Sequence, residues 1–116
     1  MKRLGVLIFT ILTSSVVMAG FICRDTLPDV HDPTIAYRTQ ITIDTIASGQ
    51  FPPAWHNTLN YGYGYPLNLY YAPLITYLTA IATSLVGNVV IGVKLTLWCI
   101  TLFGILGVYK LVIKYG

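Results

Sequence analysis

The residues best suited to chemistry lie close together in the first third of the chain. His31 is followed directly by Asp32, and Asp29 lies nearby. A carboxylate can act as a general base or hold a divalent cation that binds a phosphate, and a neighbouring histidine can share either role. An aspartate before a proline is also a common helix N-cap, which is the structural alternative for Asp32. His31 and Asp32 are thus candidate catalytic residues, with a divalent cation as the one candidate cofactor, and at this point the helix cap stays open as the alternative for Asp32.

Four other residues are candidates for binding a substrate. Arg38 could bind a phosphate through its planar guanidinium, and Lys94 could bind a lipid phosphate. His56 could serve as a ligand or a proton carrier, and Tyr63 could stack against a sugar ring. Each also has a structural interpretation. Arg38 could be a charge on the helix surface, and Lys94 could extend its ammonium group to the lipid headgroups. His56 could be a hydrogen-bonded residue at the interface, and Tyr63 an interfacial ring. The sequence contains no Gly-rich phosphate loop, Ser-His-Asp spacing or zinc motif, so we assign no metal ligands.

The composition indicates a membrane protein. The chain has 116 residues, of which 55% are hydrophobic and only 9% are charged. A soluble domain carries about 25% charged residues, so this chain has too few charges to cover a soluble surface. The formal net charge of +3 is too small and too scattered for a nucleic-acid interface, which excludes nucleic acid as a partner. Cys23 and Cys99 match no metal spacing and imply no disulfide framework.

The first hydrophobic run, residues 4–22, begins directly after Lys2 and Arg3. Its length is close to the roughly 20 residues that cross a bilayer as a helix. A signal peptide cleaved after Ala19 is the alternative, but the run continues through Phe21 and Ile22. We therefore expect an uncleaved transmembrane helix in residues 1–22. The positive-inside rule leaves its basic start in the cytoplasm and places the segment that follows outside.

The outer segment, residues 23–88, carries all four acidic residues of the chain. From about residue 33 to 48 the sequence has helix punctuation, with Asp32 and Pro33 before it and Gly49 after it. We expect an amphipathic helix there, and the alternation over residues 40–44 leaves a strand as the alternative. On the helix, one face is apolar and is formed by Ile35, Ala36, Ile43, Ile46 and Ala47. The opposite face is polar and is formed by Arg38, Thr42 and Thr45.

A second helix is expected over residues 73–86, ending at Gly87 and Asn88. It has a stripe of leucine and isoleucine on one side and a stripe of threonine on another, and its short length suits a helix lying in the membrane interface. Before it, residues 51–74 form a stretch rich in glycine, proline, asparagine and tyrosine, which predicts an ordered loop. Its aromatic rings suit the depth of the lipid headgroups.

Charge placement decides between two topologies. Residues 89–109 are long enough to span, with Lys94 near their start and Lys110 and Lys114 beyond their end. If residues 73–86 lie on the surface, the chain crosses twice and both final lysines are inside, as the positive-inside rule prefers. If those residues also span, the chain crosses three times. We expect an all-α membrane protein with two transmembrane helices, residues 89–116 holding the second one and a cytoplasmic basic end.

Three stretches resemble the N-terminal part of large bacterial membrane glycosyltransferases of the glycosyltransferase-C type. They are "HD" at residues 31–32, "SGQFPPAW" at residues 48–55 and "NYGYGYPLNLYYAPL" at residues 60–74. The likeness is to the membrane proteins called "6-pyruvoyl-tetrahydropterin synthase-related" and covers almost the whole chain. The zinc histidines of the soluble pterin enzyme have no counterpart in this sequence.

The resemblance implies transfer of a sugar from a polyprenyl-phosphate carrier at the outer face of the bacterial inner membrane. It also implies an essential acidic residue in the first outer loop, which corresponds to Asp32, and juxtamembrane helices in that loop. Such enzymes have many more transmembrane helices than this chain, because the reaction favours a water-excluding cavity. We therefore expect a fragment or module that is inactive alone and pairs with the remaining helices of a longer protein. The alternative function is a small non-enzymatic membrane protein that binds lipid or a partner through its aromatic outer loop.

Overall fold

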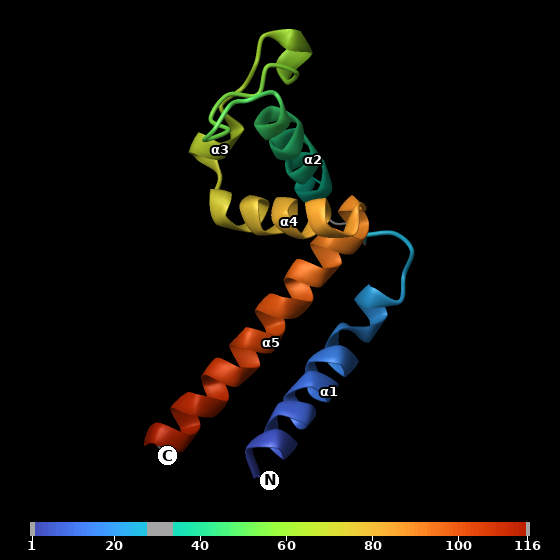
Figure 1. The fold of residues 1–116 in the computed structure, drawn as a ribbon, viewed down its shortest axis with the longest axis vertical. Coiled ribbons are helices and arrows are strands. Elements are labelled where there is room, and N and C mark those ends of the chain that lie inside the picture. Colours follow the sequence, from blue (N-terminus) through green and yellow to red (C-terminus); the bar gives the residue numbers. More distant parts are fainter. Residues whose placement is uncertain (1, 28–33, 116) are drawn as a thin grey trace. The chain divides into compact units, whose positions relative to one another are not determined.

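The computed structural model describes residues 2–27 and 34–115, and every regular element in these ranges is helical. The predicted all-α class is therefore confirmed. The helices of Figure 1 are α1 (Lys2–Ile22), α2 (Thr34–Ala47), the 3₁₀ turn η1 (Asn60–Gly62), α3 (Leu67–Tyr70), α4 (Pro73–Val86) and α5 (Val89–Tyr115).

The chain divides into two compact units. The terminal unit contains α1 and α5 from Lys94 onward, and the central unit contains α2, η1, α3, α4 and the start of α5 up to Val93. In the terminal unit the two helices run in opposite directions, so that the start of α1 and the end of α5 lie at the same end (Figure 1). The hydroxyl groups of Thr10, Thr13 and Ser14 in α1 donate to backbone carbonyls of the same helix, that of Thr10 to Val6 at 2.8 Å.

Among the described helices, α5 alone is long and apolar enough to cross a membrane by length and composition. Its 27 residues span about 40 Å, against a hydrocarbon core of roughly 30 Å. The apolar part of α1, Ile8–Ile22, is shorter than a membrane-spanning helix requires, and so is α4. A second crossing by α1 thus stays a prediction from the sequence.

The central unit is held together by α2 packed against α4. The Oγ1 atoms of Thr39 and Thr79 lie 2.7 Å apart in this interface. Thr39 also bonds to the Ile35 carbonyl at 2.7 Å, and Thr79 bonds to the Thr76 carbonyl at 3.0 Å. Because these hydroxyl groups have partners, burying them does not leave unsatisfied polar groups between the helices.

The buried faces of α2 and α4 carry threonine where the sequence pattern suggests an apolar face. In α2, Thr39, Thr42 and Ile41 are buried, whereas Ile46 and Ala47 of the expected apolar face are exposed. In α4 the threonine stripe is buried and the leucine stripe is exposed; the buried residues are Thr76, Thr79, Ala80 and Thr83, and the exposed ones are Leu74, Leu78, Ile81 and Leu85. Thr39 and Thr79 have small side chains that bond to their own helix, so the two helices can approach closely there and the larger apolar side chains stay outside.

A tight corner joins α4 to α5. Gly87 ends α4 with a positive φ of 72°, and its N–H donates to the Thr83 carbonyl. The Asn88 side chain then accepts a hydrogen bond from the Ile91 N–H at 3.1 Å, which caps the start of α5. At Gly92 an added Cβ would lie 2.7 Å from the Thr83 Cα, so only glycine fits there without a backbone shift. The corner therefore holds the start of α5 against the last turns of α4.

Candidate functional site

The loop between α2 and α4 folds around His56. The backbones of His56 and Tyr65 exchange two hydrogen bonds of 3.1 Å, which closes the loop at its base. Gly64 has a φ of 82°, and an added Cβ would lie 2.2 Å from Nε1 of Trp55, so the indole rests directly against the glycine backbone. Asn68 of α3 donates from Nδ2 to the Pro53 carbonyl at 2.9 Å. The loop is thus an ordered structure with its own contacts.

His56 is fully buried and joins the loop to α2. Its Nδ1 lies 2.8 Å from the Thr45 hydroxyl, which itself lies 2.8 Å from the Ile41 carbonyl and donates its proton there. The hydroxyl must then accept from Nδ1–H, which leaves Nε2 without a proton. Nε2 is buried and has no hydrogen-bond partner among the described residues. Burial lowers the pKa of His56 and so favours the neutral imidazole.

Arg38 of α2 contacts Tyr71 in the short link between α3 and α4. The guanidinium carbon lies 3.8 Å from the centre of the Tyr71 ring, within the range of a cation–π interaction. Arg38 is half-buried, so its position is set by packing as well as by charge. This contact ties the middle of α2 to the segment that leads into α4.

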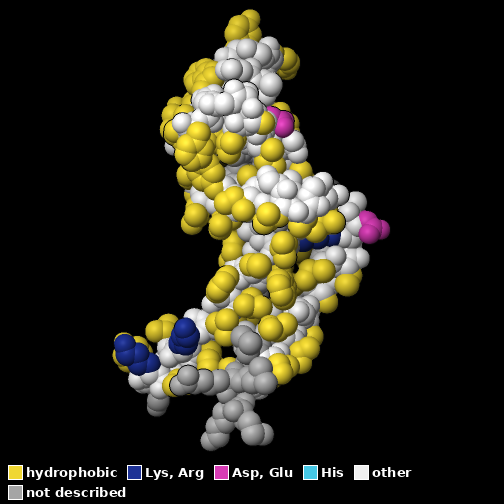
Figure 2. Space-filling view, viewed as in Figure 1, with side chains coloured by type: hydrophobic (Ala, Val, Ile, Leu, Met, Phe, Trp, Pro, Cys, Tyr) yellow, Lys and Arg dark blue, Asp and Glu magenta, His cyan; other side chains and the backbone are white. Residues whose placement is uncertain are grey.

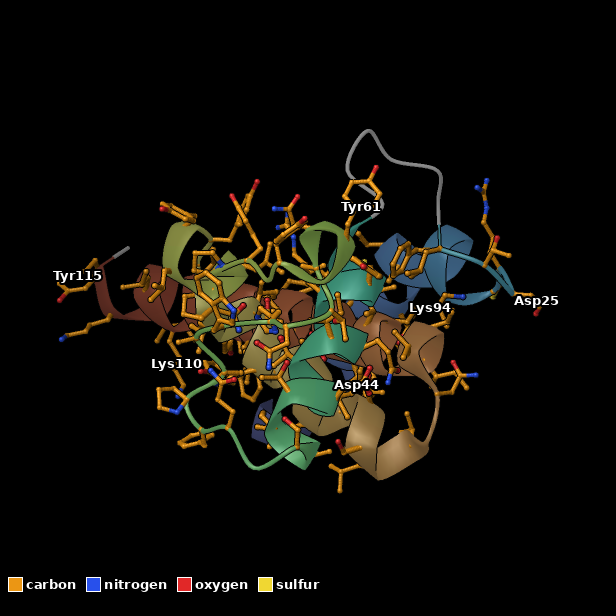
Figure 3. The ribbon with its side chains drawn as sticks, turned by 90° about the horizontal axis from the view of Figure 1, so that it is seen from above. Asp25, Asp44, Tyr61, Lys94, Lys110 and Tyr115 are labelled. Atoms are coloured by element: carbon orange, nitrogen blue, oxygen red, sulfur yellow. The ribbon has the colours of Figure 1, made fainter. Side chains whose placement is uncertain are left out.

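Tyr63 and most other rings of the loop face outward. Tyr61, labelled in Figure 3, is fully exposed, and Tyr63, Tyr70 and Phe51 are largely exposed. These rings are therefore free to contact a lipid, a sugar or another protein segment.

Lys94 lies in the terminal unit and is only 7% exposed (Figure 3). Its ammonium group donates to the Arg24 carbonyl and lies 3.4 Å from the Ile22 carbonyl. These carbonyls are at the end of α1, where a cation is favourable. Lys94 thus holds the end of α1 to α5, a role that the sequence interpretation did not include.

The candidate catalytic residues His31 and Asp32 lie outside the described residues. Of the four predicted binding residues, the structure places Arg38, His56 and Tyr63 in the central unit and Lys94 in the terminal unit. Within the described ranges, no group of three or more His, Cys, Asp or Glu side chains is placed to hold a metal ion.

An apolar groove between α2 and α4, which we call the α2–α4 groove, was not predicted from the sequence. It has a volume of about 800 Å³. Its lining residues are Ile43, Ile46, Ala47, Phe51, Tyr77, Ala80, Ile81, Ser84 and Leu85. Two sequence features could have predicted the groove, because both supply residues to its lining. They are the expected apolar face of α2 and the leucine and isoleucine stripe of α4.

Comparison with known proteins identifies no relative. No protein-family model matches the chain, and no curated protein or solved structure matches it. The functional assignment therefore depends on the residues and their geometry.

Proposed function

We propose that this chain is the N-terminal module of a membrane glycosyltransferase that takes a sugar from a polyprenyl-phosphate carrier at the outer face. One observation carries the proposal. Residues 48–55 and 60–74, the two longer stretches that resemble glycosyltransferases of this type, pack against each other. Trp55 lies against Gly64, and Asn68 bonds to the Pro53 carbonyl. A loop that only linked two membrane helices would need no such contacts, whereas a loop that helps to build an active site must be held in one shape.

In this proposal Asp32 accepts the proton of the acceptor hydroxyl as that oxygen attacks the anomeric carbon of the sugar. The bond from that carbon to the carrier phosphate breaks, and the phosphate leaves with the bonding electrons. α2 begins at Thr34, two residues after Asp32 in the sequence, and it carries Arg38, whose positive charge suits the phosphate. Tyr63 is exposed and can stack on the sugar. His56 and Lys94 act as positioning residues, because both are buried and bonded within the chain.

The test is Asp32→Asn in membranes of cells in which the variant replaces the wild-type chain, so that any further subunits are present. Transfer from labelled polyprenyl-phosphate sugars should fall by a factor of about 10² to 10⁴, the usual contribution of a general base. Asparagine also caps helices well, so folding should be retained. The matched control is Asp44→Asn, because Asp44 is an exposed carboxylate of α2 that accepts a hydrogen bond from Gln40 at 2.8 Å. Equal transfer by both variants would refute the proposal.

A second candidate function is a non-enzymatic membrane protein that binds lipid or a partner through the aromatic loop. The observation that favours it is the outward position of the loop rings, including those of Tyr61 and Tyr63. Such a protein would tolerate Asp32→Asn and would lose binding when these two tyrosines are replaced by serine.

A further inference from the structure

We propose that the α2–α4 groove holds an acyl chain of a membrane phospholipid. Its volume of about 800 Å³ lies within the range of about 300–1,000 Å³ typical of ligand pockets. No charged side chain lines it, and the Ser84 hydroxyl donates to the Ala80 carbonyl at 2.9 Å. The groove thus offers hydrocarbon contacts with few polar groups, which suits a hydrocarbon chain.

Several of the side chains that line the groove are large, apolar and exposed. Phe51 is 76% exposed, Ile81 60% and Leu85 81%. They stay outside because the threonines of α2 and α4 occupy the interface between the two helices. Figure 2 shows hydrophobic side chains over much of the visible surface of the chain, with few charged ones among them. Apolar surface of this extent is unfavourable in water and becomes favourable against hydrocarbon.

The position of the groove along the chain points to lipid as the occupant. Ser84 and Leu85 line it in the last turns of α4, and only Gly87 and Asn88 separate α4 from α5. The contact of Gly92 with Thr83 holds the start of α5 beside these turns. α5 is long and apolar enough to cross a membrane, so the groove-lining turns of α4 are only a few residues along the chain from a segment that can enter the bilayer. The groove shares Ile81 and Leu85 with the exposed stripe of α4, a helix with no charged residue.

The experiment uses a phospholipid with a photoreactive diazirine midway along one acyl chain. The full chain is reconstituted into vesicles of phosphatidylethanolamine and phosphatidylglycerol that contain this lipid. After illumination, the modified residues are mapped by mass spectrometry. We expect modification within residues 43–51 and 77–85, besides modification of α5 that reports insertion.

Filling the groove should remove the first set of modifications. Ala47 lines the groove and is exposed, so Ala47→Trp occupies it without displacing a buried side chain. Modification of residues 43–51 and 77–85 should fall about tenfold, which corresponds to losing roughly 1.4 kcal/mol of binding free energy. Ala72→Trp is the matched control, because Ala72 is exposed and lies outside the groove. Circular dichroism of both variants checks that their helices are retained.

Two results would overturn the proposal. The first is modification of α5 without modification of the groove, as expected if a second copy of the chain covers it. The second is equal modification of the Ala47→Trp variant and the wild-type chain. This experiment measures no sugar transfer, so its failure is distinguishable from failure of the glycosyltransferase proposal.

Discussion

At the scale of single residues, His56 holds the aromatic loop to α2. Its backbone pairs with Tyr65, and its Nδ1 donates to the Thr45 hydroxyl. Nε2 is buried without a hydrogen-bond partner. Protonation of Nε2 would therefore place an unpaired positive charge in a buried position, which is unfavourable. We therefore expect the order of the loop to depend on the protonation of His56.

We expect the central unit to lose stability in mild acid. The pKa of His56 is lowered from 6.5 by burial, so the unfolded chain takes up a proton more readily than the folded one. The contribution of His56 is therefore fully present above about pH 6.5 and is lost as the pH falls through the folded pKa. The loss is at most about 1.4 kcal/mol per pH unit. Denaturant unfolding followed by Trp55 fluorescence, in a Trp98→Phe background, measures it at pH 8 and pH 5.5.

Two variants separate His56 from the other histidine of the chain. His56→Gln should remove this dependence on pH, since glutamine does not titrate. His31→Gln should leave it unchanged. A His56→Gln variant that keeps the full dependence on pH would show that another group is responsible.

At the scale of elements, the sequence predicts where helices lie better than which faces they bury. The observed helices Thr34–Ala47 and Pro73–Val86 fall at the predicted residues 33–48 and 73–86, because proline and glycine mark their ends. A helical pattern separates apolar from polar faces but does not say which face meets the neighbouring helix. Threonine can turn inward by bonding to its own backbone, so the buried face differs from the one that hydropathy suggests.

The sequence indicates which residue types could form a candidate site but not the contacts they make. Tyr63 is exposed, and its contact with lipid or sugar stays a prediction. The roles of His56 and Lys94 depend on partners distant in the sequence, the Thr45 hydroxyl and the Arg24 carbonyl, which no local pattern shows. The short helix α3 and the α2–α4 groove also depend on contacts across the loop and between helices.

The corner between α4 and α5 gives a prediction at this scale. Gly92→Ala should destabilise the chain by about 1–3 kcal/mol, because the new Cβ would meet the Thr83 backbone. Gly104→Ala, in the same helix, has no neighbour within 4 Å and should be neutral or stabilising by up to about 1 kcal/mol. Denaturant titration in mild detergent measures both. A Gly92→Ala variant as stable as Gly104→Ala would contradict the close contact.

At the scale of the whole molecule, a helix that is long and apolar enough to cross a membrane follows an ordered central unit along the chain. α5 is the described helix that can span, and the central unit carries the aromatic loop and the α2–α4 groove. Both the transferase proposal and the lipid proposal place the central unit at the bilayer, and the transferase proposal requires its outer face. The position of the loop relative to the membrane is therefore the central claim.

Cysteine labelling tests this claim most directly. Single cysteines are placed at Asn57, Asn88 and Lys114, which are exposed, after Cys23 and Cys99 have been replaced by serine. A membrane-impermeant reagent added to intact cells should label positions 57 and 88 and leave position 114 protected until the membrane is opened. Labelling at 57 and 114 with protection at 88 would show three crossings and refute the surface position of α4. Protection at 57 would place the aromatic loop in the cytoplasm and contradict the transferase proposal.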